Sequence, residues 1–280
     1  MMSTDHATSV KTEDIFLRRL LAKIETGGLD VRRFRPSYLE RRLAVRLRAT
    51  GTPDHFHYYR YLERHPDELP RLLEALTVNV TEFFRNEEVF QAMEREYFPA
   101  LIREKEARGH SLVRIWSAGC SSGEEVFTLA MIMARCVERA NSRLSFTIYG
   151  TDVDDRCVAR GRRMLYPNKG LDSIPPRFRG CTVPQGPKSF TFAPKIKRLV
   201  RFKRLDLFVD ISIKFVDMVF CRNVLIYFDH RQQEELIERF REALVPGGIL
   251  TIGKSEKLND RSRGFVLVDR NRRIYRKSSD

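Results

Sequence analysis

The chain has 280 residues, a formal net charge of +14 and five cysteines. It contains no apolar run long enough to span a membrane, and its first residues are too polar for a signal peptide. The cysteines show no C-x-x-C spacing and no paired histidine, so we expect reduced thiols in the cytoplasm, with no disulfide framework and no metal site. A chain of this length can bury a good core and is expected to contain more than one domain.

Residues 1–76 are predicted to form an all-α N-terminal domain. Apolar residues recur at helical spacing from residue 12 onward, and glycines and prolines separate the helices. The helix that begins at Pro36 carries Arg42 and Arg46 four residues apart, and we expect their guanidinium groups to lie side by side on the surface. These arginines belong to a basic segment, residues 31–48, with seven arginines and one glutamate. It predicts either a surface for an acidic partner or an ordinary solvated face.

The sequence T-V-N-V-T-E-F-F-R follows at residues 77–85. Asn79, Thr81 and Arg85 place three polar groups among valines and phenylalanines. One such residue alone would indicate a helix cap, whereas three beside two aromatic residues suggest the lid of a site. We therefore predict a linker helix and cofactor lid over residues 77–95, followed by the second domain over residues 96–280. A helix rich in charged residues is expected from Asn86 to about Arg108.

Residues 113–125, V-R-I-W-S-A-G-C-S-S-G-E-E, organise this second domain. An apolar strand breaks at small residues and is followed by an amphipathic helix over residues 123–139, which is the first unit of a nucleotide-binding α/β sheet. Gly119 and Gly123 allow a sharp turn and the close approach of a ligand, because neither carries a Cβ.

The acidic residues of this domain indicate the ligand. The next predicted strand, residues 144–150, leads to Asp152, which is placed to bind the two hydroxyls of a ribose. Glu124 and Glu125 stand at the N-terminus of the helix, where they would repel a pyrophosphate. Two glutamates suit a ligand with hydroxyls, an amine and a sulfonium, which favours S-adenosylmethionine over NAD or ATP.

The α/β alternation is interrupted at residues 164–198, which are rich in proline and glycine and are predicted to form a small inserted β subdomain. This region lies in a second basic segment, residues 160–205, with thirteen lysines and arginines against one acid. It predicts a surface for an acidic partner. Asn223 stands just past a predicted strand at residues 215–220, where ligands of open α/β sheets bind. The later elements are predicted as a helix at residues 230–244, stopped by Pro246-Gly247-Gly248, a strand at 249–252 and a hairpin of 265–268 and 272–275.

Five motifs, in this order, resemble those of the chemotaxis receptor methyltransferases of the CheR type: N-V-T-E-F-F-R, W-S-A-G-C-S-S-G-E-E, T-D-V-D, C-R-N-V-L-I-Y-F and V-P-G-G-I-L-T-I-G-K-S-E. The resemblance covers nearly the whole chain. It implies a Rossmann-like methyltransferase sheet with a C-terminal β hairpin, an inserted β subdomain and an N-terminal all-α domain. It also implies methyl transfer from S-adenosylmethionine to glutamate side chains on the cytoplasmic helices of chemoreceptors, in sensory adaptation. The products would be glutamate methyl esters and S-adenosylhomocysteine.

The resemblance further implies which residues bind the cofactor. They would be Asn79, Thr81 and Arg85 in the first motif, Gly119 and Glu125 in the second, Asp152 at the ribose, Asp206 and Leu207 beside the adenine, and Asn223 and Val224 near the sulfonium. In some members of the family the inserted subdomain binds a short peptide at the receptor's tail. The sequence departs from the family at Val126-Phe127, where Pro-Tyr is frequent, and at Lys254, where His is frequent.

Arg85 and Tyr227 are the predicted catalytic residues. A glutamate carboxylate is already ionised at neutral pH, with an ordinary pKa of about 4.3, so no general base is required. We expect Arg85 and Tyr227 to orient the incoming carboxylate by hydrogen bonds, with Arg85 able to donate two at once. Tyr227 could alternatively be a core aromatic residue beside Ile226 and Phe228.

Three other functions fit parts of the sequence. G-C-S-S-G matches the nucleophile elbow of α/β-hydrolases with Ser121 as nucleophile, but the only later histidine is His230, at the start of a predicted helix. The basic insertion would suit a nucleic-acid methyltransferase, but it lacks interleaved aromatic residues and an N-P-P-Y type motif. A catalytically inactive adaptor is disfavoured because every presumed cofactor position is filled. We expect neither a nucleic-acid partner nor insertion into a membrane.

Overall fold

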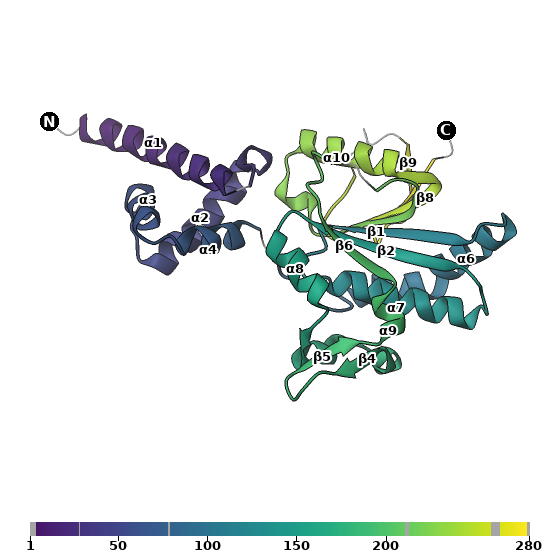
Figure 1. The fold of residues 1–280 in the computed structure, drawn as a ribbon. Coiled ribbons are helices and arrows are strands. Elements are labelled where there is room, and N and C mark those ends of the chain that lie inside the picture. Colours follow the sequence, from purple (N-terminus) through teal and green to yellow (C-terminus); the bar gives the residue numbers. More distant parts are fainter. Residues whose placement is uncertain (1–3, 28, 78, 211–212, 259–263, 279–280) are drawn as a thin grey trace. The chain divides into compact units, whose positions relative to one another are not determined.

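The computed structural model describes residues 4–27, 29–77, 79–210, 213–258 and 264–278. These divide into two compact units (Figure 1). The helical unit comprises Met1–Asn79 and Tyr227–Gln232, and the α/β unit comprises Val80–Ile226 and Gln233–Asp280. Within the described ranges, no helix has the length and apolar character needed to cross a membrane.

The helical unit confirms the predicted all-α N-terminal domain. The second of its helices starts with Pro36 in the first turn, where the missing N–H costs nothing, and ends at Gly51, whose φ of +68° suits a C-terminal cap. The third helix is capped by Asp54, whose carboxylate accepts the His57 backbone N–H at 2.8 Å. The helices are α1 (Thr4–Thr26), α2 (Pro36–Thr50), α3 (His55–Arg64) and α4 (Glu68–Leu76), with a 3₁₀ turn at Val31–Arg33.

The prediction that Arg42 and Arg46 lie side by side on the surface is wrong. Arg46 donates from Nε and Nη2 to the two oxygens of Glu68, at 2.9 and 2.8 Å. Glu68 is only 1% exposed and also accepts the Tyr58 hydroxyl at 2.8 Å. The guanidinium of Arg42 lies 5.6 Å over the ring of Tyr38. Helical spacing brings two side chains near one another, but it gives no information about a buried acid on another helix. Because Arg46 pairs with Glu68, part of this basic segment is neutralised inside the helical unit.

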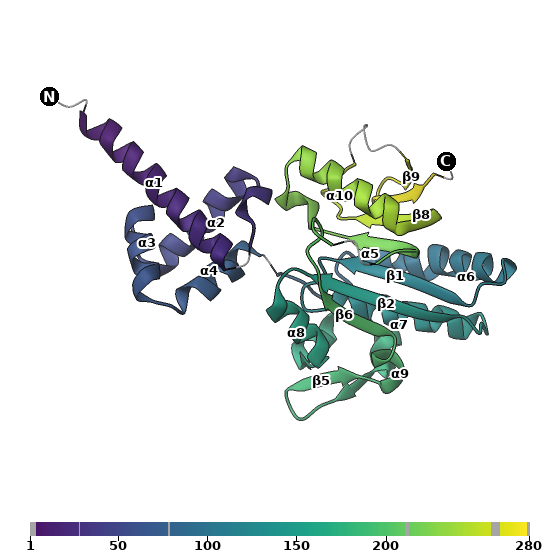
Figure 2. The same ribbon diagram turned by 45° about the horizontal axis from the view of Figure 1, so that its top comes forward.

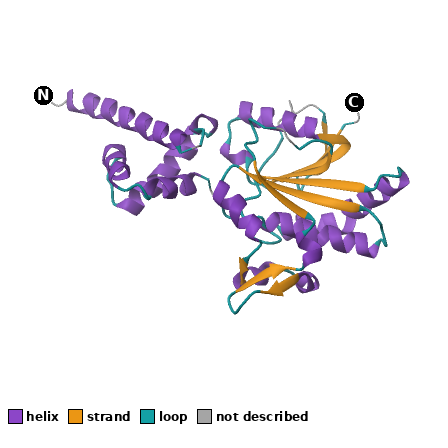
Figure 3. Cartoon of the chain, viewed as in Figure 1, coloured by secondary structure: helices purple, strands orange, loops and turns teal. Residues whose placement is uncertain are grey.

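The α/β unit contains a seven-stranded sheet in the order β6-β2-β1-β7-β8-β10-β9 (Figures 1 and 3). The first five of these strands are parallel, and β10 runs antiparallel to both of its neighbours. This confirms the predicted Rossmann-like sheet with a C-terminal hairpin. The strands are β1 (Leu112–Ala118), β2 (Ser145–Asp152), β6 (Val200–Arg204), β7 (Val216–Cys221), β8 (Leu244–Ile252), β9 (Phe265–Asp269) and β10 (Ile274–Lys277).

Helices cover both faces of this sheet. Helix α10 (His230–Ala243) lies on one face, and α7 (Glu124–Arg139) and α6 (Phe98–Ala107) lie on the other (Figures 1 and 2). The central strands are buried: all six residues of β7 are buried, as a parallel strand between two helical layers requires. Helix α8 (Asp155–Arg163) follows β2 and packs beside β6.

Two boundaries differ from the prediction. The helix expected over residues 86–108 is divided into α5 (Glu87–Ala92), a π-helical turn (Met93–Tyr97) and α6. Pro99 lacks the N–H that would bond one turn back, which accounts for the local change of pitch. Helix α10 ends at Ala243, and Pro246-Gly247-Gly248 lies inside β8 as a bulge, because Leu244 pairs with Val216 whereas Ile249 pairs with Met218.

The inserted β subdomain is confirmed as a three-stranded antiparallel sheet in the order β3-β5-β4. Its strands are β3 (Tyr166–Pro167), β4 (Thr182–Pro184) and β5 (Ser189–Phe192). The ring of Phe192 stacks on that of Phe127 in α7, with centroids 4.0 Å apart. Phe83, Tyr166 and Phe190 complete this aromatic cluster, so the subdomain is packed firmly on the helix that begins at the candidate site.

Candidate active site

The candidate site lies at the carboxyl ends of β1, β2 and β7. The chain leaves β1 towards β2 on one side, while β7 pairs with β1 on the other, so the strand order reverses between β1 and β7. Ligands of open α/β sheets bind at this switch point. Gly119 and Asn223 follow β1 and β7, and Asp152 is the last residue of β2, so the structure places them on the same edge of the sheet.

The turn after β1 brings two of the predicted residues into contact. Gly119 has a φ of +75°, and its N–H and that of Cys120 both donate to the carbonyl of Thr151, at 2.8 and 2.9 Å. A Cβ on Gly119 would overlap with Cγ2 of Val224. A glycine is required here, since a larger residue would separate the turn after β1 from the turn after β7.

Asp152 is held by backbone donors. It is 8% exposed, its Oδ2 accepts the Ser121 N–H at 2.8 Å, and its Oδ1 accepts the Asp154 N–H at 3.0 Å. Burial raises the pKa of this carboxyl, and the backbone N–H groups act in the opposite direction. Each oxygen of a carboxylate has two acceptor positions, so these bonds leave capacity for the hydroxyls of a ligand.

The predicted adenine-side residues lie beside Asp152. The N–H of Leu205 donates to the Asp152 carbonyl at 3.0 Å, which ties the end of β6 to the end of β2. Asp206 comes next and accepts the Phe208 N–H on Oδ1 at 2.9 Å, and Leu207 between them is half-buried. Asp206 and Leu207 therefore border the same edge as Asp152.

Glu125 binds protein groups with both of its oxygens. Oε1 accepts the Ser117 hydroxyl at 2.7 Å, and Oε2 pairs with Nη1 of Arg222 at 3.1 Å. Arg222 was missed in the sequence analysis, although it stands next to Asn223 in C-R-N-V. Its Nη2 donates to the Arg85 carbonyl at 2.8 Å and to Oδ1 of Asn86 at 2.7 Å. One buried arginine thus connects β7, α7 and the segment that carries Arg85.

That segment has an irregular backbone. Phe84 and Asn86 have φ values of +56° and +61°, which are uncommon for residues other than glycine. The Phe84 N–H donates to Oγ1 of Thr128 in α7 at 3.1 Å, so the segment is fastened to the α/β unit. Arg85 donates from Nη1 to the Val80 carbonyl at 2.8 Å, and Thr81 is half-buried.

Two predicted site residues belong to the helical unit. Asn79 donates from its side-chain amide to the Thr77 hydroxyl at 3.3 Å. The ring of Tyr227 lies 5.0 Å from that of Tyr38 and 6.4 Å from that of Phe34. The other predicted residues belong to the α/β unit, whereas Asn79 and Tyr227 are held by contacts within the helical unit.

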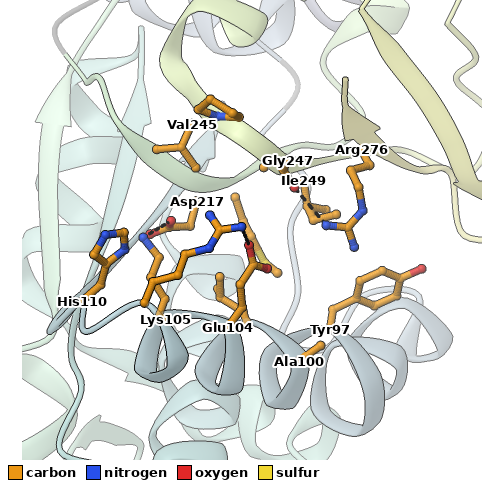
Figure 4. A pocket seen from close by; sticks show the side chains of 15 residues that line it. Tyr97, Ala100, Glu104, Lys105, His110, Asp217, Val245, Gly247, Ile249 and Arg276 are labelled. Carbon is orange, nitrogen blue, oxygen red and sulfur yellow. Dashed lines mark hydrogen bonds and ion pairs between the residues drawn. The ribbon is translucent and has the colours of Figure 1, made fainter. Parts of the chain in front are cut away.

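A pocket of about 270 Å³ lies at the opposite edge of the sheet, beside the start of β7 (Figure 4). Lys105 and Asp217 form an ion pair there at 2.5 Å, and Arg276 donates to the Gly247 carbonyl at 3.0 Å. The pocket is thus separate from the candidate site, and these two cations already have partners.

Two family models match the chain. The all-alpha domain of the CheR methyltransferases matches residues 17–77, and their SAM-binding domain matches residues 79–274. A chemotaxis protein methyltransferase of Listeria monocytogenes is 29% identical over 86% of this chain and 90% of its own. The Escherichia coli protein of that name is 30% identical over 95% and 92%, and a chemotaxis protein methyltransferase 2 of Pseudomonas aeruginosa is 32% identical over 82% and 81%. The chain therefore belongs to the CheR family of S-adenosylmethionine-dependent methyltransferases.

Proposed function

We propose that this protein transfers a methyl group from S-adenosylmethionine to glutamate carboxylates of chemoreceptors, in the cytoplasm, during sensory adaptation. The relatives that bear the name chemotaxis protein methyltransferase support this substrate. The observation that carries the proposal is the acidic, glycine-lined edge formed by Gly119, Glu125, Asp152 and the Asn223 turn.

The residues of this edge fit S-adenosylmethionine. Asp152 retains acceptor capacity for ribose hydroxyls, and Gly119, without a Cβ, lets the turn after β1 lie directly against Val224. Glu124, in the first turn of α7, disfavours a phosphate and tolerates a cationic ligand, whereas the charge of Glu125 is balanced by Arg222. We assign Thr81, Arg85, Asp206, Leu207 and Asn223 to the same ligand, together with Asn79.

When bound, S-adenosylmethionine supplies a methyl group on a positively charged sulfur. A carboxylate oxygen of the substrate forms the new C–O bond while the S–C bond breaks and its electron pair stays on sulfur. No proton is transferred, so the protein needs no general base. Its contribution is to hold the carboxylate in line, to remove part of its water and to exclude competing solvent.

Arg85 and Tyr227 are the residues that we assign to the incoming carboxylate. A guanidinium has five N–H donors, and the Arg85 bond to the Val80 carbonyl uses only Nη1. A strong ion pair would make the carboxylate a poorer nucleophile, so a second, neutral donor such as the Tyr227 hydroxyl suits this reaction. The side chain of Arg222 is 3% exposed and paired with Glu125. It donates a hydrogen bond to the backbone carbonyl of Arg85 and so helps to hold the backbone at Arg85 in place.

The basic inserted subdomain is our candidate for binding a receptor tail peptide. Lys169, Arg179, Lys188 and Lys195 are exposed on it, and Asp172 is the only acid in residues 164–198. An acidic tail peptide would be attracted to this surface. Replacing Lys188 and Lys195 with glutamate should weaken binding of such a peptide in a fluorescence titration, while leaving the methylation of a tail-less receptor fragment unchanged.

The test is methylation of a purified chemoreceptor cytoplasmic fragment with tritiated S-adenosylmethionine. We expect label that mild alkali releases as methanol, because methyl esters hydrolyse and N-methyl groups do not. Label should fall when the methylated glutamates are replaced by glutamine. Alkali-stable label, or label on added nucleic acid instead of receptor, would refute the proposal.

A further inference from the structure

We infer that Glu256 is a positioning residue for the cofactor site: its buried carboxylate fixes the turn that presents Asn223 and Val224. This inference rests on the proposed function of that edge. Glu256 follows β8, whereas Asn223 and Val224 follow β7, so the contact joins the carboxyl ends of two neighbouring parallel strands.

The carboxylate of Glu256 accepts backbone N–H groups from two turns. Oε2 accepts the N–H groups of Gly253 at 2.5 Å and of Asn223 at 3.1 Å, and Oε1 accepts the N–H of Ile226 at 3.2 Å. The residue is 4% exposed, and burial raises the pKa of its carboxyl while the backbone donors oppose that rise. A buried carboxylate with donors on both oxygens is a rigid clamp, because releasing either side would leave buried polar groups unsatisfied.

The turn that it holds is one that the backbone does not prefer. Asn223 has a φ of +61°, in the left-handed region, although asparagine tolerates this better than most residues. Val224 comes next and fills the space in front of Gly119. The Glu256 bonds to Asn223 and Ile226 bracket this turn, so they set where Val224 meets the turn after β1.

The close packing around Gly253 also depends on the hydrogen bonds of Glu256. A Cβ at this position would come within 2.6 Å of Oε2 of Glu256 and 2.9 Å of the Asn223 nitrogen. Both atoms belong to the hydrogen bonds just described, so an alanine here must push the carboxylate and the turn apart. Gly180, in the inserted subdomain, has open space around the corresponding position and is a matched control.

Glutamine is a nearly isosteric probe for Glu256. Its amide has one acceptor oxygen where the carboxylate has two. Its NH₂ group would replace the second oxygen and would face a backbone N–H, so two donors would meet without an acceptor. We expect Glu256→Gln to weaken binding of S-adenosylhomocysteine about tenfold or more, as loss of one buried acceptor implies. The KM for S-adenosylmethionine should rise similarly, whereas the KM for the receptor fragment should not change. Glu242→Gln, on the exposed side of α10, is the control and should bind like wild type.

Amide hydrogen exchange separates positioning from general destabilisation. In a folded Glu256→Gln variant, protection should fall at Asn223, Ile226 and Gly253 and persist at Val219 inside β7. If that variant does not fold, Gly253→Ala against Gly180→Ala decides the question by the same measurements. Wild-type affinity and wild-type protection at Asn223 in a folded variant would overturn the inference. Failure of wild-type protein to bind S-adenosylhomocysteine would instead refute the proposed function itself.

Discussion

Arg222 and Glu125 form a buried ion pair, with Nη1 and Oε2 3.1 Å apart and side chains 3% and 14% exposed. The pair joins the end of β7 to the first turn of α7. Through Nη2, Arg222 also reaches the carbonyl of Arg85. One guanidinium therefore joins three motifs that lie far apart in the chain, namely those that contain Arg85, Glu125 and Arg222 itself.

Removing this guanidinium should destabilise the α/β unit strongly. In Arg222→Met, Glu125 becomes a buried carboxylate without its cation, which typically costs about 3–5 kcal/mol. Arg239→Met is the control, because Arg239 pairs with Glu235 at 3.1 Å on the surface, where such pairs contribute about 0–1 kcal/mol. Urea unfolding would measure both free energies. Equal losses in the two variants would contradict the structural role of Arg222.

The helical unit offers a similar comparison between adjacent residues. Glu68→Gln leaves the Arg46 guanidinium with a neutral partner in a buried site, and we expect a loss of about 3 kcal/mol. Asp67→Asn breaks an exposed pair with Arg71 and should cost less than about 1 kcal/mol. Urea unfolding of the isolated variants, followed by circular dichroism, would show whether the buried pair dominates. A larger loss in Asp67→Asn would be contrary to this assignment.

Cofactor affinity should decrease with acid because of Asp152. Burial raises the pKa of its carboxyl, so protonation occurs above the ordinary aspartate value of about 3.9. A protonated Asp152 loses acceptor capacity for ribose hydroxyls, so the Kd for S-adenosylhomocysteine should rise as the pH falls through the raised pKa of this carboxyl. Affinity that does not change as Asp152 becomes protonated would speak against Asp152 as the ribose ligand.

The contribution of Asp152 to stability should have the opposite sign. The folded protein binds this proton more tightly than the unfolded chain does, so its contribution increases as pH falls through the raised pKa and decreases as pH rises. Comparing the pH dependence of unfolding in wild type and Asp152→Ala isolates this contribution. The difference between the two proteins should change as the pH falls through the raised pKa and should become constant below the ordinary pKa of aspartate, where Asp152 is protonated in both the folded and the unfolded state.

Arg85→Ala and Tyr227→Phe should each reduce turnover. Hydrogen bonds to a charged group contribute about 1.5–3 kcal/mol, so kcat should fall roughly tenfold to a hundredfold if either donor orients the substrate carboxylate. Single-turnover methylation of the receptor fragment would measure this directly. Wild-type turnover in both variants would end their assignment as catalytic residues.

The sheet could be predicted from the sequence because its strands are apolar runs that end at polar or glycine-containing turns. The residues that follow β1, β2 and β7 could be placed on one edge for the same reason. Contacts between distant polar side chains could not be predicted, because periodicity carries no information about them. Arg46 therefore seemed a surface cation, and Arg222 and Glu256 were overlooked, although both stand inside motifs that were recognised.

Boundaries depended on local backbone geometry that composition does not reveal. Gly247, with a φ of +75°, bulges within β8 where a helix stop was predicted.

The surroundings of Tyr227 could not be predicted either. Its ring lies beside that of Tyr38, almost two hundred residues away in the chain, and the motif that contains Tyr227 gives no information about this contact.

Binding of S-adenosylmethionine by Asp152 and its neighbours can be measured by isothermal titration with S-adenosylmethionine and S-adenosylhomocysteine. The proteins compared would be wild type, Asp152→Ala and, as a control, Asp172→Ala on the exposed inserted subdomain. We predict micromolar binding by wild type and Asp172→Ala and loss of binding by Asp152→Ala. Absence of binding by folded wild-type protein, or undiminished binding by Asp152→Ala, would show that this edge of the sheet is not the cofactor site.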